Sequence, residues 1–173
     1  MSAIDHLATW HDQDRFHVVV EAPAGSRLKY TYDEKLKLFV ISRPLALGIS
    51  YPFDWGFVPG TRAADGDPLD AMVLSDIPSY PGVVHICHPV GVVRLTQKEG
   101  TGKRVANDRV IAIPAYRCAL ADTAVEPGLS KERRDELERF FINASLFEGK
   151  AVRIEGWDGP KAAVKIIKHG VVS

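Results

Sequence analysis

The 173-residue sequence lacks an excess of charge of either sign, because 22 lysines and arginines balance 22 aspartates and glutamates. A neutral chain with no basic stripe interleaved with aromatic residues is not expected to bind nucleic acid. No apolar run approaches the roughly 20 residues that cross a bilayer, and residues 1–15 are polar and contain no signal-peptide core. We therefore expect a cytoplasmic protein with no membrane partner.

Cysteine is also scarce, since Cys87 and Cys118 are the only two in the chain. Two cysteines 31 positions apart do not make a disulfide framework, so we expect reduced, structural thiols. His85 and His88 flank Cys87, but this spacing on a strand points the two imidazoles to opposite faces. That arrangement argues against a zinc site.

Short strand-like runs bounded by turn residues dominate the first two thirds of the chain. A helix follows, capped by Ser130 and reaching about Phe147, then a strand over 151–157 and a helix over 160–168. Pro89 is expected to divide its strand or to mark a bulge. The pattern predicts an α+β fold in one domain, residues 1–173, built on a small barrel or sandwich. The early strand-like runs are Phe16–Glu21, Leu28–Tyr32, Lys37–Ile41, Tyr51–Phe57, Ala71–Leu74, Val83–Leu95 and Val105–Ile113.

The hexapeptide over residues 65–70 places Asp65, Asp67 and Asp70 within six positions, together with a glycine and a proline. Like charges this close repel unless a positive group lies among them, and Mg²⁺ prefers carboxylate oxygens. An EF-hand loop is excluded, because it needs Gly and Glu where this stretch has Asp70 and Asp76. An ordinary surface turn has a similar composition, so a metal site and a plain turn both remain open.

Several charged or phenolic residues stand alone in strand-like surroundings. Glu21 ends an apolar run, Lys29 adjoins Tyr30, and Arg43 and Tyr51 each precede a proline. Taken singly, each of these residues is typical of a solvated strand edge.

Taken together, these residues and their neighbours resemble the soluble family I inorganic pyrophosphatases. The resemblance implies a five-stranded OB-like β-barrel with additional strands and two flanking C-terminal helices. It also implies homo-oligomers and Mg²⁺-dependent hydrolysis of diphosphate, with Mn²⁺ as a possible substitute. The segments that carry it are 21–24, Lys29-Tyr30, Arg43, 51–59, 65–70, 89–91 and 152–157.

The same resemblance assigns roles to individual residues. Asp65 and Asp70 are implied as metal ligands, Glu21 as a ligand of an outer metal or its waters, and Asp67 as the base for the attacking water. Phosphate oxygens are implied to bind Lys29, Arg43 and Tyr51. These residue types suit the hydrolysis of diphosphate. A polyanionic substrate needs cations to neutralise its charge, and the attacking water needs a base beside it.

The sequence departs from the family pattern in the second half of the implied site. Asn107 stands where a metal-binding acid is expected and can offer only a neutral carbonyl oxygen, while Arg109 replaces a substrate-binding lysine. Another expected acid falls near Gln97, although Glu99 or Asp108 could take its role. With four carboxylates instead of seven, weaker metal binding and reduced activity are expected. The other altered positions are Thr31, Trp55, Ala144 and Ser145.

Two alternatives to diphosphate hydrolysis remain open. Small residues at Ala144 and Ser145 would open one wall of the site, which favours a bulkier phosphoanhydride substrate. The chain could also be a catalytically inactive protein that keeps the fold and binds an anion.

Overall fold

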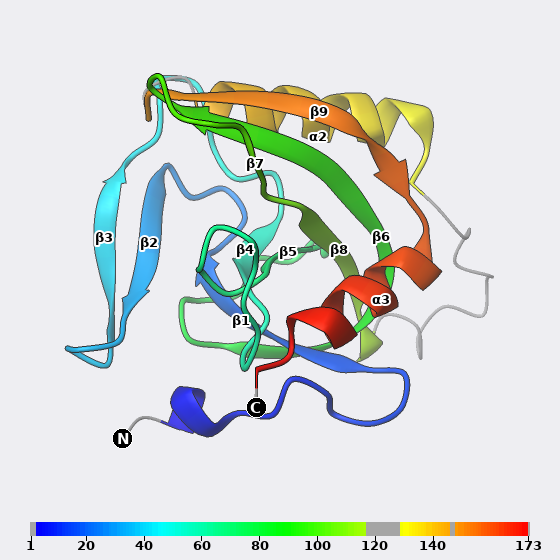
Figure 1. Ribbon diagram of the computed structural model, residues 1–173. Coiled ribbons are helices and arrows are strands. Elements are labelled where there is room, and N and C mark those ends of the chain that lie inside the picture. Colours follow the sequence, from blue (N-terminus) through cyan, green and yellow to red (C-terminus); the bar gives the residue numbers. More distant parts are fainter. Residues whose placement is uncertain (1–2, 117–128, 146–147, 173) are drawn as a thin grey trace.

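The computed structural model describes residues 3–116, 129–145 and 148–172. Its centre is a ring of five strands, in which each strand pairs with its neighbours and β1 also pairs with β6 (Figure 1). The β5 and β8 strands run parallel, and the other pairs in the ring are antiparallel. This ring confirms the predicted five-stranded barrel. In ring order the strands are β1 (Phe16–Ala22), β4 (Asp54–Phe57), β5 (Asp70–Val73), β8 (Arg109–Pro114) and β6 (Val84–Glu99).

Further strands extend from the ring or stand beside it. The long β6 also pairs with β7 (Val105–Ala106) and with β9 (Lys150–Asp158). A separate hairpin of β2 (Leu28–Asp33) and β3 (Leu38–Pro44) stands beside the barrel (Figure 1). A short 3-10 helix, η1 (Ala3–His6), precedes β1.

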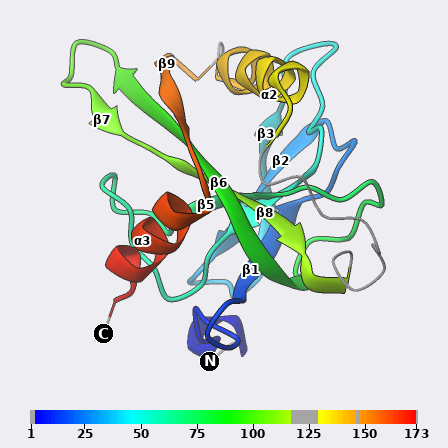
Figure 2. The ribbon, with the colours of Figure 1, turned by 90° about the vertical axis from the view of Figure 1, so that its right-hand side faces the viewer.

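Both faces of the sheet are buried. Successive side chains along each strand point to opposite faces, so the apolar residues form two separate hydrophobic clusters. Val93 and Ile111 belong to the cluster that contains Phe140, whereas Val92 and Val110 belong to the other. The two clusters are covered by α2 (Lys131–Ala144) and α3 (Pro160–Gly170), respectively. The two helices lie on opposite sides of β6 (Figure 2). This arrangement confirms the two C-terminal helices that were predicted to flank the barrel.

The helix termini carry the predicted signals. The Ser130 side chain caps α2 by accepting a hydrogen bond from the Arg133 backbone N–H, and Pro160 occupies the first turn of α3. Leu137, Phe140 and Phe141 form the buried face of α2. Neither these helices nor any other helix in the described part of the chain is long and apolar enough to span a membrane.

The contact between β1 and β4 depends on Gly56. A Cβ atom at this position would lie 1.9 Å from the carbonyl oxygen of Val19. Only glycine allows the two backbones to approach this closely, and this approach positions Trp55 beside the site described below.

Several predicted element boundaries are wrong. The run over 51–57 forms a strand only from Asp54, because the Tyr51 backbone instead bonds with residues 25 and 26. The run over 105–113 is broken at Asn107, whose backbone N–H donates to Leu95. The helix α2 ends at Ala144 and not near Phe147. Pro89 marks a bulge within one strand, which confirms one of the two predicted outcomes there. Residues 146–147 and Cys118 lie outside the described residues.

Candidate active site

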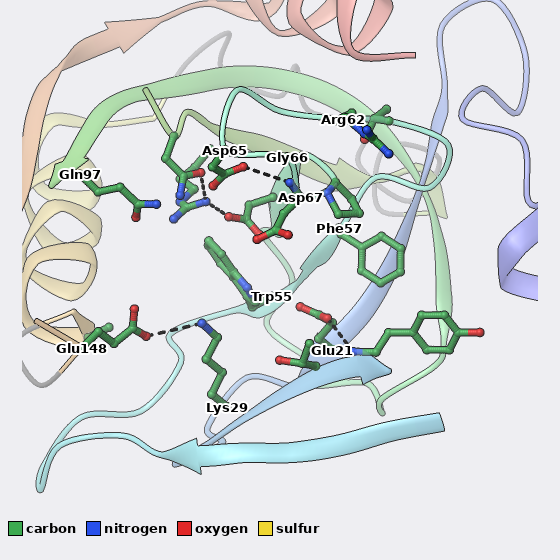
Figure 3. A pocket seen from close by; sticks show the side chains of 18 of the residues that line it. Glu21, Lys29, Trp55, Phe57, Arg62, Asp65, Gly66, Asp67, Gln97 and Glu148 are labelled. Carbon is green, nitrogen blue, oxygen red and sulfur yellow. Dashed lines mark hydrogen bonds and ion pairs between the residues drawn. The ribbon is translucent and has the colours of Figure 1, made fainter. Parts of the chain in front are cut away.

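A cavity of about 920 Å³ opens where the ring, the β2–β3 hairpin and the C-terminal end of α2 meet. Figure 3 shows Asp65 and Asp67 on one side of the Trp55 ring, and Lys29 and Glu148 on the other. The cavity therefore has an acidic side and a side rich in cations. Every predicted site residue lines it: Glu21, Lys29, Arg43, Tyr51, Asp65, Asp67, Asp70, Asn107 and Arg109.

The acidic side is formed by a tight loop that precedes β5. The Thr61 hydroxyl anchors the base of the loop by donating to the Val58 carbonyl at 2.6 Å and accepting from the Leu69 N–H at 3.0 Å. Gly66 has a φ of +95°, which favours glycine, and the Asp65 carboxylate accepts from the Asp67 N–H at 3.3 Å. The segment is thus a local turn, and it also directs its carboxylates toward a cavity.

Arg109 links the acidic side to the floor of the cavity. Its guanidinium forms an ion pair with Asp70, donates to the Asn107 side-chain oxygen at 2.6 Å, and lies 5.2 Å from the centre of the Trp55 ring. Burial lowers the pKa of Arg109 to about 10, so it remains a cation at neutral pH. Its Nε is buried and has no acceptor among the described residues, which leaves one donor for a bound anion.

The cationic side contains Lys29 on β2 and Arg43 on β3. Both contact the carboxylate of Glu148, Lys29 at 3.5 Å from Nζ to Oε1 and Arg43 through its Nη2. Arg43 also donates to the Ala144 carbonyl at the end of α2. Burial lowers the pKa of Lys29, and the neighbouring positive charges of Arg43 and Lys150 lower it further.

Glu21, which is half-buried, and Tyr51, which is buried, lie beside these cations. The Glu21 carboxylate accepts from the Tyr32 backbone N–H at 3.0 Å, but burial has the larger effect and raises its pKa. Burial, assisted by the negative charge of Glu21, raises the pKa of the Tyr51 hydroxyl to about 12. Tyr51 therefore stays protonated at neutral pH and can donate a hydrogen bond to a bound anion.

The donor set around the cavity fits a hard divalent cation. Asp65, Asp67, Asp70 and Glu21 provide carboxylate oxygens, and Asn107 provides an amide oxygen. Over the described ranges, no three His, Cys, Asp or Glu side chains already form a closed metal cluster. The donor atoms therefore match Mg²⁺ in type, while Asp70 is engaged by Arg109.

Sequence reasoning missed Glu148, which nothing in its local sequence distinguishes from a surface residue. Gln97, which stands at the position of the other missing acid, lines the cavity. Of the two residues that could replace that acid, Asp108 points elsewhere and pairs with Arg94 at 2.5 Å, and the side chain of Glu99 lies outside the described part of the chain. The altered positions Thr31, Trp55, Ala144 and Ser145 also line it. His85 lies outside the cavity and contacts Asp54 at 3.2 Å.

Comparison with known proteins identifies the family. Residues 18–173 match the family model "Inorganic pyrophosphatase". Inorganic pyrophosphatases from Synechocystis sp. and Methanosarcina acetivorans are 34% and 37% identical to this chain over 155 and 156 residues. These matches cover 90% and 88% of this chain, and 89% and 88% of the relatives.

The fold also matches that of a solved inorganic pyrophosphatase. The crystal structure of inorganic pyrophosphatase from Thermus thermophilus superposes with a TM-score of 0.87 and 31% identity, covering 98% of this chain and 97% of that one. Fold, cavity and sequence thus agree with one another and with the resemblance noted in the sequence. The chain belongs to the family I soluble inorganic pyrophosphatases and is an inorganic diphosphatase.

Proposed function

We propose that this protein hydrolyses diphosphate with Asp67 as the general base and Mg²⁺ as the cofactor. In this proposal Asp67 accepts a proton from the attacking water at a carboxylate oxygen. Glu21, Asp65, Asp70 and Asn107 would hold the metal, and Mn²⁺ would replace Mg²⁺ in part. Bound Mg²⁺ would neutralise substrate charge and lower the pKa of a bound water.

The cations and Tyr51 bind the substrate in this proposal. Arg43 offers a guanidinium that can bind two phosphate oxygens, and Lys29 offers a compact ammonium. Tyr51 donates its hydroxyl proton, since its raised pKa keeps it protonated. The buried Nε of Arg109 supplies a further donor once the substrate is present. These donors would orient the scissile bond for attack by water.

We further propose that turnover is slower than in relatives that carry the full acid set. Neutral amides at Gln97 and Asn107 contribute no charge to metal binding. Arg109 also competes with a metal for the Asp70 carboxylate. Loss of a single stabilising group typically costs about 10²- to 10³-fold in rate, and coupled losses do not simply add.

One observation carries this proposal: all nine predicted residues line one cavity, with Asp65 and Asp67 on one side of Trp55 and Lys29 on the other. The test is steady-state release of phosphate from diphosphate by the purified protein. Turnover that requires Mg²⁺ and stops with EDTA is expected, and so is a higher KM in Arg43→Ala. Turnover unaffected by EDTA, or a KM unchanged in Arg43→Ala, would contradict it.

A second candidate substrate is a larger phosphoanhydride. The cavity volume lies at the upper end of the range for small-molecule sites, about 300–1,000 Å³, and its lining includes the small side chains of Ala144 and Ser145. A panel of nucleoside and isoprenoid diphosphates tests this candidate. A higher kcat/KM for a panel member than for diphosphate would favour it.

We also propose that residues 1–173 act as one domain in a cytoplasmic homo-oligomer. Two exposed apolar areas support self-association, because large side chains there face solvent in the isolated chain. Light scattering with size-exclusion chromatography tests the oligomer, with Ile41→Asp and Tyr80→Glu expected to shift it toward the monomer. The exposed side chains are Leu36, Leu38, Ile41 and Leu47 around the β2–β3 hairpin, and Ile77 and Tyr80 before β6.

A further inference from the structure

Glu148 places a negative charge among the cations that would hold phosphate. The residue lies between α2 and β9, and its side chain is 16% exposed and lines the cavity. One carboxylate oxygen contacts Lys29 (Figure 3) and also Arg43. The other oxygen lies 3.8 Å from the Nζ of Lys150. A single carboxylate therefore faces three cations.

A carboxylate in this position resembles a bound phosphate. Guanidinium groups bind carboxylate and phosphate oxygens with the same planar fork, so the two anions compete for Arg43. Burial lowers the pKa of Lys29, and the positive charges of Arg43 and Lys150 lower it further, as is expected where cations lie close together. The Glu148 carboxylate relieves that crowding in the ligand-free protein, and a phosphate group would relieve it in the complex.

The cavity gives the Glu148 carboxylate open space beside its present position. The Glu148 N–H donates to the Ser145 carbonyl at 3.1 Å, and Glu148 precedes Gly149, whose φ is +67°. Apart from the chain neighbours of Gly149, no atom of the described residues lies within 4 Å of the place where a Cβ of Gly149 would stand. Because Glu148 lines the cavity, its carboxylate can leave Arg43 and Lys29 by rotating within the space of the cavity itself.

We propose that Glu148 is an affinity-determining residue that competes with the substrate for the phosphate position. When diphosphate binds, the carboxylate leaves Arg43 and Lys29, and it returns as phosphate departs. The exchange weakens diphosphate and phosphate binding by a similar factor, because each anion must displace the same group. This inference rests on the proposed function, since it assumes that Arg43 and Lys29 bind phosphate.

The test is calorimetric titration at fixed Mg²⁺ with inorganic phosphate and with methylenediphosphonate, a diphosphate analogue that is not hydrolysed. Glu148→Gln is expected to bind both anions about tenfold more tightly than the wild type. A factor of this size corresponds to a wild type in which the Glu148 carboxylate leaves the phosphate position open about one tenth of the time. Glu148→Asp, whose shorter side chain keeps the charge but reaches fewer cations, is expected to be intermediate. KM for diphosphate should fall in Glu148→Gln without a rise in kcat.

The matched control is Glu155→Gln on β9, where the carboxylate accepts from the Thr96 hydroxyl outside the cavity. It makes the same change in net charge and is expected to leave both dissociation constants unchanged. If Glu148 instead orients Arg43 as a structural support, both Glu148 variants would bind more weakly, which would overturn the inference. Unchanged binding in both would also overturn it.

The two proposals fail in different ways. If none of the proteins binds either anion, the proposed function is overturned, and this inference falls with it. If the wild type binds the analogue but the Glu148 variants gain no affinity, only the role of Glu148 is overturned. Circular dichroism and thermal unfolding of each variant establish that the compared proteins are folded.

Discussion

Arg109 at the start of β8 forms an ion pair with Asp70 at the start of the adjacent strand β5. Because β5 and β8 are parallel, their first residues reach the same edge of the ring and meet inside the cavity. The pair gives Asp70 a positive partner before any metal binds. Metal binding must therefore compete with an arginine for one of the few carboxylates in the site.

Restoring an acid beside this pair should strengthen metal binding. Asn107→Asp adds a carboxylate where a neutral amide oxygen now accepts from Arg109. We expect the dissociation constant for Mg²⁺ to fall about tenfold, since charge on the ligands controls Mg²⁺ affinity. Isothermal titration with Mg²⁺ alone measures it. Asn143→Asp on α2, outside the cavity lining, is the matched control, and equal affinities in all three proteins would refute the prediction.

Tyr51 should contribute to alkaline instability. Its folded-state pKa of about 12 exceeds the ordinary value of 10.0, so between these pH values the folded protein keeps a proton that the unfolded chain releases. Stability therefore falls as pH rises from about 10 to 12. Across this window the wild type should lose up to about 3 kcal/mol more free energy of unfolding than Tyr51→Phe. This value follows from a pKa difference of about two between the folded and unfolded states, at about 1.36 kcal/mol for each pKa unit.

Urea unfolding at pH 9 and pH 12 measures the effect. Tyr80→Phe is the matched control, because Tyr80 is 75% exposed. If both variants lose as much stability as the wild type, burial of Tyr51 does not raise its pKa in the folded protein.

Gly56→Ala should destabilise the barrel strongly. The new methyl group would overlap the Val19 carbonyl, which is backbone in the paired strand β1 and cannot move without breaking the ladder. We expect a loss of about 3 kcal/mol or more in the free energy of unfolding. Thermal or urea unfolding measures it. Gly159→Ala is the control, because among the described residues no atom other than those of its chain neighbours lies within 4 Å of its Cβ position. Similar losses in the two variants would contradict this account.

The family resemblance predicted the five-stranded barrel and the members of the site, whereas the residue pattern alone indicated a small barrel or sandwich, a possible metal loop and the two C-terminal helices. The hexapeptide over 65–70 and the apolar face of α2 depend on neighbouring residues, and the structure places both as expected. Glu148 could not be predicted, because it meets Arg43 and Lys29 from 105 and 119 residues away. The interruption of the predicted strand at Asn107 could not be predicted for a similar reason, because it depends on a backbone hydrogen bond from Asn107 to Leu95.

The most direct test of the proposed mechanism is phosphate release from diphosphate by the wild type and by Asp67→Asn, purified in the same way. Loss of a general base typically costs about 10²- to 10⁴-fold. The account predicts Mg²⁺-dependent turnover in the wild type and a fall of at least about 10²-fold in kcat for Asp67→Asn. Equal rates in the two proteins would contradict the assignment of Asp67 as the base.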